Sequence, residues 1–293
     1  MHPKPPALNP LASIAALEAP RLAEPVTGAL LRPTIHAEVG HYRLRMAETV
    51  EDREAACRLR FKVFNIELGE GLESSYETGL DRDQFDDCCE HLLVEDKLSR
   101  RVVGTYRMQS GRTAAANFGY YSEQEFSLAP YEALRAEILE LGRASIDREH
   151  RTPEVLTLLW RGIAQYATDM GLRYLLGCSS LNSQDPVLGW KMFEQLGNYR
   201  VSPEFMTTTT EAFECPIEPR QRSAQNDTCL ENQEASEPVK VPKLLKTYLA
   251  IGARIAAPPA WDREFGTIDF LTLLDLRMMS TAARNRFLAP LER

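Results

Sequence analysis

Residues 138–147 constrain the fold most, because they form an apolar run of strand length that contains two charged residues. A charge within a buried strand is costly unless it is paired or used in function. Glu140 and Arg143 are an odd number of residues apart, so a regular strand would direct them to opposite faces of a sheet. Gly142 lies between them, and a glycine within a strand often marks a β-bulge. The sequence therefore predicts a central strand whose bulge returns both side chains to one face.

A polar turn and a helix follow this strand. In the turn, residues 148–152, Thr152 is a suitable helix N-cap, and Pro153 suits the first helical position. A strand that separates from its neighbour at a bulge can hold a ligand in the gap, and the helix N-terminus can hold an anion. The alternative interpretation, a structural ion pair that crosses the sheet, is equally compatible with this stretch alone.

The rest of the chain alternates between strand and helix patterns. We expect strands at 41–47, 91–95, 101–109, 173–178, 199–208 and 267–276. We expect helices at 51–66, 128–136, 153–170, 186–196 and 241–257. This order indicates an α/β (α+β) fold in which helices flank one mixed sheet.

Composition divides the chain into four segments. Residues 1–40 are rich in proline and alanine and predict a flexible N-terminal arm, and residues 41–210 predict the core. Residues 211–240 are mainly polar and of low complexity, which predicts a disordered insertion. Residues 241–293 return to a helix pattern and a closing strand, which we expect to complete the core.

Residues 67–90 form an acidic stretch in which Arg82 is the single basic residue. Such a run is most often a solvated loop. The spacing of Asp81, Asp83 and Asp86 could also bind a cation, either an amine or a metal. The stretch lacks the glycine and the distal glutamate of an EF-hand loop, so we expect no metal there.

Charge and hydropathy exclude several classes of function. The net charge of −8 argues against a nucleic-acid partner. No apolar run approaches the roughly 20 residues that span a bilayer, and the N-terminus lacks a signal-peptide pattern. We therefore expect a cytoplasmic protein. Its six cysteines are scattered without a Cys-x-x-Cys pair, which indicates reduced, mainly structural thiols.

The helix expected at 241–257 carries Lys243, Lys246 and Arg254 and no acidic residue. A basic amphipathic helix can rest on a membrane surface or on an acidic partner, which would make the protein peripheral on the inner membrane. A packing helix with a basic outer face is the alternative interpretation, and the favoured one.

Several motifs occur in one order along the chain. They are Arg60-Phe-Lys-Val-Phe64, Asp81-Arg-Asp-Gln-Phe-Asp86, Val103-Gly-Thr-Tyr-Arg107, Glu140-Leu-Gly-Arg-Ala144, Leu158-Leu-Trp-Arg-Gly162 and Pro259-Ala-Trp-Asp262. Their combination resembles the GNAT superfamily and, within it, the bacterial L-ornithine N-alpha-acyltransferases of ornithine-lipid synthesis. The resemblance covers residues 42–210 and 241–288. It implies a GNAT-like, mostly antiparallel twisted sheet with a bulged central strand.

The same core also resembles the acyl-homoserine-lactone synthases. The residues that match their charged signature are Arg60, Phe64, Asp81, Asp83, Asp86, Arg107, Glu140 and Arg143. Both families move an acyl chain from acyl carrier protein to an amino group. The synthases normally end near the equivalent of residue 210, so the C-terminal segment favours the ornithine family.

Amide formation from a thioester needs a neutral amine near the carbonyl, a proton acceptor and an oxyanion donor. It needs no metal. We assign Glu140 as the candidate base and place Arg143 beside it in the catalytic set. We assign substrate binding to Arg60, Phe64, Asp81, Asp83, Asp86 and Arg107. The aspartates would hold a cationic amino acid and one arginine its carboxylate; alternatively, the arginines only brace the acidic stretch.

The turn at 148–152 has no glycines, unlike the pyrophosphate-binding loop of relatives that use CoA. We therefore expect acyl carrier protein as the donor, with phosphopantetheine entering on the carrier and no cofactor on this chain. Carrier proteins are acidic, so we expect a docking patch of Arg148, His150, Arg151 and Arg161.

The resemblance implies transfer of a (3-hydroxy)fatty acyl group from acyl carrier protein to the alpha-amino group of ornithine, giving lyso-ornithine lipid. An N-acyltransferase for another amino acid such as glycine, or an enzyme like the acyl-homoserine-lactone synthases, is the alternative. A protein of another class, an idle lipid-binding scaffold, would have no need of Glu140 and Arg143.

Overall fold

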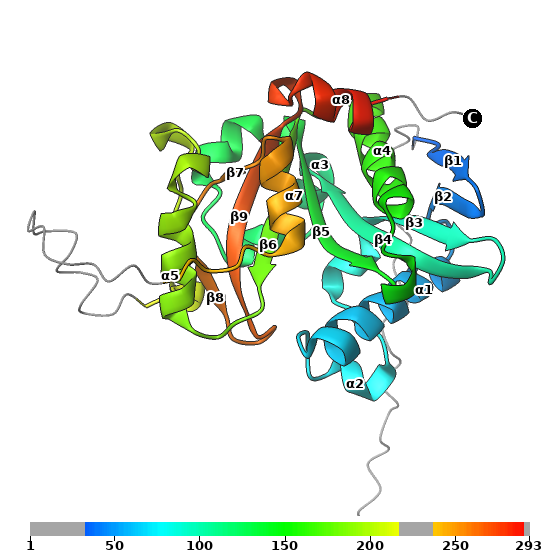
Figure 1. Cartoon of the computed structure of the whole chain (residues 1–293), viewed down its shortest axis with the longest axis horizontal. Helices are drawn as coiled ribbons and strands as arrows, with labels where there is room; N and C mark the ends of the chain where they lie inside the picture. The colour runs from blue at the N-terminus through cyan, green and yellow to red at the C-terminus, as the bar shows by residue number, and fades with distance from the viewer. Residues whose placement is uncertain (1–32, 217–236, 290–293) are drawn as a thin grey trace, which may run out of the picture. The chain divides into compact units, whose positions relative to one another are not determined.

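A computed structural model describes residues 33–216 and 237–289 (Figure 1). In this part of the chain, nine strands form one sheet in the order β1-β2-β3-β4-β5-β6-β9-β7, and β8 pairs with β9. Every neighbouring pair is antiparallel except β5 and β6, which run parallel. The predicted mixed, mostly antiparallel sheet flanked by helices is confirmed.

The helices and strands occur in an order close to the predicted one. The strands are β1 (His36–Val39), β2 (Tyr42–Met46), β3 (Glu90–Asp96), β4 (Arg101–Ser110), β5 (Ile138–Ile146), β6 (Tyr174–Leu181), β7 (Arg254–Ile255), β8 (Ala260–Asp262) and β9 (Thr267–Asp275). The α-helices are α1 (Val50–Phe61), α2 (Ser75–Thr78), α3 (Gly111–Ala116), α4 (Pro153–Asp169), α5 (Pro186–Gln195), α7 (Lys243–Ile251) and α8 (Thr281–Phe287). α1 continues as a π-helix over Lys62–Leu68, and the helix expected at 128–136 is a 3-10 helix over Ala129–Glu137.

Two expected elements differ from the structure. The strand expected at 199–208 is wrong: the chain forms 3-10 turns at Gly197–Tyr199 and Pro203–Phe205, since a proline donates no ladder hydrogen bond. The helix expected at 241–257 ends at Ile251, because Gly252 adopts the left-handed conformation, with φ of 112°, that ends helices. Arg254 therefore lies on β7 and not on the helix, which corrects the predicted basic face.

The predicted arm and insertion fall largely outside the described residues. Residues 1–32 of the arm are not described, but residues 36–39 form β1 and pair with β2, so the arm as predicted extends too far. Residues 217–236 of the insertion are likewise outside the described part. Its first residues include a 3-10 turn at Glu211–Phe213 and a bridge from Glu214 to Ala260, so they belong to the fold.

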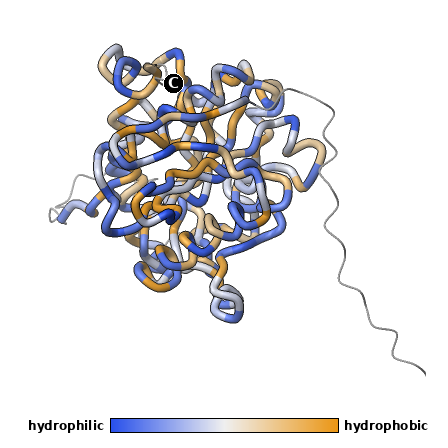
Figure 2. The backbone as a smooth tube through the Cα atoms, turned by 90° about the vertical axis from the view of Figure 1, so that its right-hand side faces the viewer, coloured by the Kyte–Doolittle hydropathy of each residue, from blue (hydrophilic) through white to orange (hydrophobic). Residues whose placement is uncertain are grey.

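Helices cover both faces of the sheet because successive strand residues point to opposite sides. Leu92 and Val94 of β3 pack against α4, while Leu93 between them packs with residues of α1. Figure 2 shows hydrophobic and hydrophilic parts of the backbone intermixed throughout the fold. At Gly162 of α4, an added Cβ would lie 2.8 Å from a methyl carbon of Leu44, so this glycine allows the helix to lie close to the sheet.

The bulge predicted in the central strand is confirmed. Arg107 of β4 pairs with Gly142, and Thr105 pairs with Ser145, so β5 has one extra residue between these two pairs. Arg143 lies in that interval and has a left-handed φ of 51°. This is the local geometry that a bulge imposes on the strand that contains the extra residue.

The two parallel strands separate immediately before this bulge. β5 pairs with β6 only from Ile138 to Glu140, after which β6 continues against β9 alone. At the point of separation, an added Cβ on Gly177 would lie 2.2 Å from the carbonyl oxygen of Leu141. Glycine at this position therefore permits the backbones to touch just before they diverge, and the divergence opens the centre of the sheet.

Candidate functional site

A cavity of about 850 Å³ fills the gap between the diverging strands. Its wall includes residues 141–146 of β5 and residues 177–181 of β6. One group of lining side chains is aromatic or aliphatic: Tyr106, Leu156, Trp160, Leu175, Tyr248 and Leu274. A second group is charged: Glu70, Arg107, Glu125, Glu140, Arg143, Arg151, Lys243, Asp262, Asp269 and Arg286. A pocket with a large apolar wall and a few charged groups suits a ligand that is itself part hydrocarbon and part ionic.

Glu140 is buried in this wall and accepts three hydrogen bonds. Its carboxylate receives the backbone N–H groups of Tyr121 and Ser122, at 2.8 and 2.7 Å, and the Ser122 hydroxyl at 2.6 Å. These donors come from the start of the 3-10 helix Tyr121–Gln124. Burial raises the pKa of Glu140, and the hydrogen bonds from Ser122 and Tyr121 oppose that rise without cancelling it. A carboxyl group with a raised pKa suits general-base work near neutral pH.

Arg143 also faces the cavity, as expected from the bulge in β5. Its guanidinium carbon lies 4.9 Å from the centre of the Tyr121 ring and 4.4 Å from that of Phe265. Nη2 donates to Asp83 at 3.3 Å, whereas Nε makes no hydrogen bond and lies 3.7 Å from Oδ2 of Asp81. Arg143 therefore pairs with the acidic stretch while it lines the cavity.

The acidic stretch is exposed at Glu67, Glu73 and Glu77, as expected of a solvated run, but Asp81 and Asp86 are not solvated, which corrects the sequence interpretation there. Asp81 and Asp86 are almost completely buried, and the fully buried Arg60 binds both of them. Its Nε donates to Asp81 at 2.8 Å, and its Nη1 and Nη2 donate to the two oxygens of Asp86 at 2.6 and 2.8 Å. Arg107 donates to Asp83 at 2.6 Å and lies 3.3 Å from Asp86.

These pairs bear on the two roles that the sequence left open for the arginines. Burial alone would raise the pKa of Asp86, but the charge and hydrogen bonds of Arg60, together with the charge of Arg107, outweigh burial and the net shift is downward. Of the six predicted substrate-binding residues, Phe64 and Arg107 line the cavity, and Arg60, Asp81, Asp83 and Asp86 do not. This placement favours arginines that brace the acidic stretch over aspartates that bind an amine.

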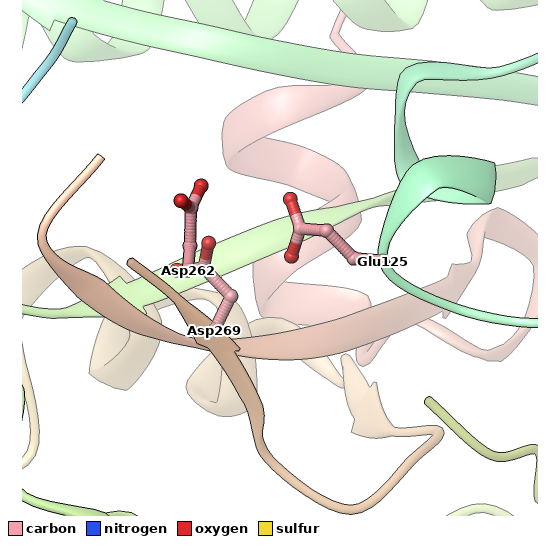
Figure 3. Close-up of side chains that lie close together, drawn as sticks. All are labelled: Glu125, Asp262 and Asp269. Atoms are coloured by element: carbon pink, nitrogen blue, oxygen red, sulfur yellow. The ribbon is translucent and has the colours of Figure 1, made fainter. Parts of the chain in front are cut away.

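A second acidic cluster, which sequence reasoning missed, lies in the cavity wall. Glu125, Asp262 and Asp269 converge from the end of the 3-10 helix, from β8 and from β9 (Figure 3). One carboxylate oxygen of each lies within 4.8 Å of the others, and all three residues are at least 95% buried. Burial raises the pKa of Asp269 to about 6 and that of Glu125 well above its usual range. Such a cluster can hold a cation, either an ammonium group or a metal ion.

Three of the four predicted docking residues, Arg148, His150 and Arg151, lie in the turn that leads into α4, and the fourth, Arg161, lies within α4. Arg148 and Arg151 are exposed, and Arg151 pairs with Glu67 through both guanidinium ends, at 2.5 and 2.7 Å. His150 shares a hydrogen bond with the Tyr42 hydroxyl at 3.0 Å. Arg161 lies more than two turns into α4, and its Nε donates to the backbone carbonyl oxygen of Arg286. The Glu67 pair reduces the positive charge that this patch presents.

The helices in residues 33–216 and 237–289 include none with the length and hydropathy of a membrane-spanning segment.

Comparisons with known proteins agree with this architecture. The family model described as an acetyltransferase (GNAT) domain matches residues 59–161. The L-ornithine N(alpha)-acyltransferase of Rhodobacter capsulatus is 29% identical over 254 residues, an alignment that covers 83% of this chain and 93% of that protein. The L-ornithine N(alpha)-acyltransferase of Brucella abortus is 29% identical over 273 residues, covering 86% and 93%.

Solved structures to which this chain is similar include the AHL synthase LasI, with a TM-score of 0.47 and 10% identity. That alignment covers 86% of this chain and 99% of LasI. FeeM, an N-acyl amino acid synthase from uncultured soil microbes, has a TM-score of 0.45 and 12% identity, covering 84% of this chain and 96% of FeeM.

Proposed function

This chain is an acyltransferase with a GNAT-like fold, and we propose that it transfers a (3-hydroxy)fatty acyl group to the α-amino group of ornithine, forming lyso-ornithine lipid. The observation that carries the proposal is the cavity at the strand divergence. It combines a wall for a hydrocarbon chain with buried carboxylates and an arginine, which are the complements of an amino acid with two amines and one carboxylate.

The proposed reaction uses Glu140 as the proton acceptor. The neutral α-amine attacks the thioester carbonyl carbon, Glu140 takes the amine proton, and the tetrahedral intermediate collapses with cleavage of the carbon–sulfur bond. The thiolate leaves on the donor and is then protonated. Arg143 supplies a guanidinium group for the carboxylate of the acceptor, and Arg107 also lines the cavity.

We propose acyl carrier protein as the donor, because the turn before α4 contains no glycine and its exposed arginines suit an acidic partner. At equal low concentrations and low salt, turnover with 3-hydroxyacyl carrier protein is expected to exceed turnover with the matching acyl-CoA by roughly tenfold or more, since electrostatic steering accelerates association. Steady-state assays with both donors test this. Equal turnover with the two donors at every salt concentration would exclude a docking surface that is specific for the carrier protein.

We also propose peripheral contact with the inner membrane through α7. Lys243 and Leu244 line the cavity, and Leu244 is an exposed apolar side chain beside the two lysines of this helix. The double variant Lys243→Glu/Lys246→Glu should bind anionic vesicles less tightly at low salt by more than about 2 kcal/mol, since each base contributes about 1 kcal/mol. Co-sedimentation measures this.

The matched control for the membrane test is Arg58→Glu/Arg112→Glu, which reverses two exposed charges on α1 and α3. If both double variants lose the same affinity for anionic vesicles, net charge governs membrane binding and α7 is not the contact site.

The lipids of a bacterial host that makes no ornithine lipid test the proposed function. Expression of the protein should give a lipid with the mass of ornithine plus a hydroxyacyl chain in amide linkage. The same host expressing Glu140→Gln should give far less. If the only new lipid contains glycine or another amino acid, the acceptor assignment is wrong.

A further inference from the structure

The Glu125–Asp262–Asp269 cluster lacks the compensation that the structure gives its other buried acids. Arg60 and Arg107 neutralise the aspartates of the acidic stretch. In the described residues, no lysine or arginine forms an ion pair with Glu125, Asp262 or Asp269. Neither oxygen of Glu125 has a hydrogen bond of normal geometry, nor has Oδ1 of Asp269, although the Cys178 thiol and the Asp269 carboxyl are near enough to Glu125 to affect its pKa. Buried acceptors without donors are costly, so this arrangement indicates a partner that comes from outside the chain.

The cavity gives such a partner access to the cluster. All three residues line it, as does Glu70, whose pKa is raised to about 7 by burial and by the charge of Asp269. The acceptors without a hydrogen bond are the two oxygens of Glu125 and Oδ1 of Asp269. Asp262 adds a third carboxylate, whose Oδ1 already receives the backbone N–H groups of Glu264 and Phe265. The three open acceptors match in number the three donors of a primary ammonium group.

We propose that this cluster is the subsite for the side-chain ammonium group of the acceptor, and that it selects amino acids with a cationic side chain. The inference rests on the proposed function, because it assigns a place to the second amine of ornithine. A divalent metal is the less suitable occupant, since Mg²⁺ requires near-ideal octahedral coordination and Ca²⁺ takes six to eight oxygens.

The cluster and the proposed base line the same cavity. Ser122, which donates two hydrogen bonds to Glu140, also accepts the backbone N–H of Glu125 at 3.2 Å through its carbonyl oxygen. A 3-10 helix rises about 2 Å per residue, so about 6 Å of backbone joins Ser122 to Glu125. This short connection is the reason that the proposal assigns the two amines of one acceptor molecule to Glu140 and to the cluster.

The test compares ornithine with norvaline, which has a methyl group in place of the aminomethyl group. Glu125→Gln and Asp269→Asn should each lower kcat/KM for ornithine by roughly 10- to 100-fold, the range for a lost hydrogen bond to a charged group. The preference for ornithine over norvaline should fall by the same factor. Glu194→Gln, on the exposed side of α5, is the matched control and should keep the preference. Equal losses with both substrates would overturn the inference, because the cluster would then act on structure or chemistry.

Calorimetric binding separates this inference from the proposed function. Wild-type protein should bind ornithine more tightly than norvaline, and Glu125→Gln should remove the difference, whether or not ornithine is acylated. Binding of both amino acids with equal affinity would overturn the inference. So would binding of Mg²⁺ or Ca²⁺ that depends on Glu125 and prevents ornithine from binding, because the cluster would then be a metal site.

Discussion

Arg60→Met is expected to destabilise the protein by about 3–5 kcal/mol, because it removes the principal partner of two buried carboxylates and leaves each with only a longer ion pair, from Arg143 to Asp81 and from Arg107 to Asp86. Methionine retains an apolar stem of similar shape, so the loss of the guanidinium dominates the effect. Urea denaturation followed by circular dichroism measures the free energy of unfolding. Arg58→Met, two residues earlier on the exposed side of α1, is the matched control and should change stability by less than about 0.5 kcal/mol.

Neutral partners should restore part of the lost stability. The triple variant Arg60→Met/Asp81→Asn/Asp86→Asn replaces both aspartates with neutral asparagines, which do not need a cationic partner. This variant should therefore be more stable than Arg60→Met alone. If Arg60→Met is as stable as the wild type, the arginines do not brace the acidic stretch, and the aspartates return as candidates for substrate binding.

The same network predicts sensitivity to acid. The folded-state pKa of Asp86 is lowered, so its contribution to stability is present above its unfolded pKa, about 3.9. That contribution is lost as the pH falls below this value toward the folded-state pKa. In Arg60→Met the downward shift should largely disappear, and stability should depend less on pH in this window.

Glu140→Gln is expected to lower kcat by about 10²–10⁴-fold, the usual contribution of a general base, while KM for ornithine changes little. The substitution keeps the side-chain volume, and the glutamine oxygen can still accept hydrogen bonds from Ser122. Because the pKa of Glu140 is raised, the wild-type rate should increase with pH as the carboxyl group loses its proton. The variant should lose this limb of the pH–rate profile.

A folded Glu140→Gln variant with full kcat across the pH range would contradict the assigned role. Glu140 would then be a structural charge that positions the turn at Tyr121 and Ser122, and the base would lie elsewhere in the cavity. Asp269, with its pKa raised to about 6, would be the next candidate.

The local features of the site could be predicted because their causes are adjacent in sequence. The odd spacing of Glu140 and Arg143 around Gly142 requires a bulge if both charges are to share a face, and the bulge is present. Thr152 and Pro153 specify the start of α4, where the Thr152 hydroxyl accepts the backbone N–H of Val155. These signals need no knowledge of distant contacts.

The remaining features depend on contacts between distant segments. The acidic stretch resembled a solvated loop because nothing nearby in sequence indicates that Arg60 of α1 would pair with Asp81 and Asp86. Likewise, Glu125 and Asp269 meet only because β9 adds to the sheet beside β6. Pro203 prevents the strand that the pattern at 199–208 predicts, and Gly252 ends the helix that the pattern beyond Ile251 predicts. Hydrophobic periodicity alone does not include these effects of proline and glycine.

Reconstituted acyl transfer tests the central claim most directly. Purified protein, ornithine and 3-hydroxyacyl carrier protein should yield a product with the mass of N-acylornithine, and fragmentation should place the acyl group on the α-nitrogen. Wild-type protein should form it and Glu140→Gln should form it about 10²–10⁴ times more slowly. Acylation of the side-chain nitrogen, or no ornithine product while the thioester is hydrolysed or passed to another amine, would contradict the account.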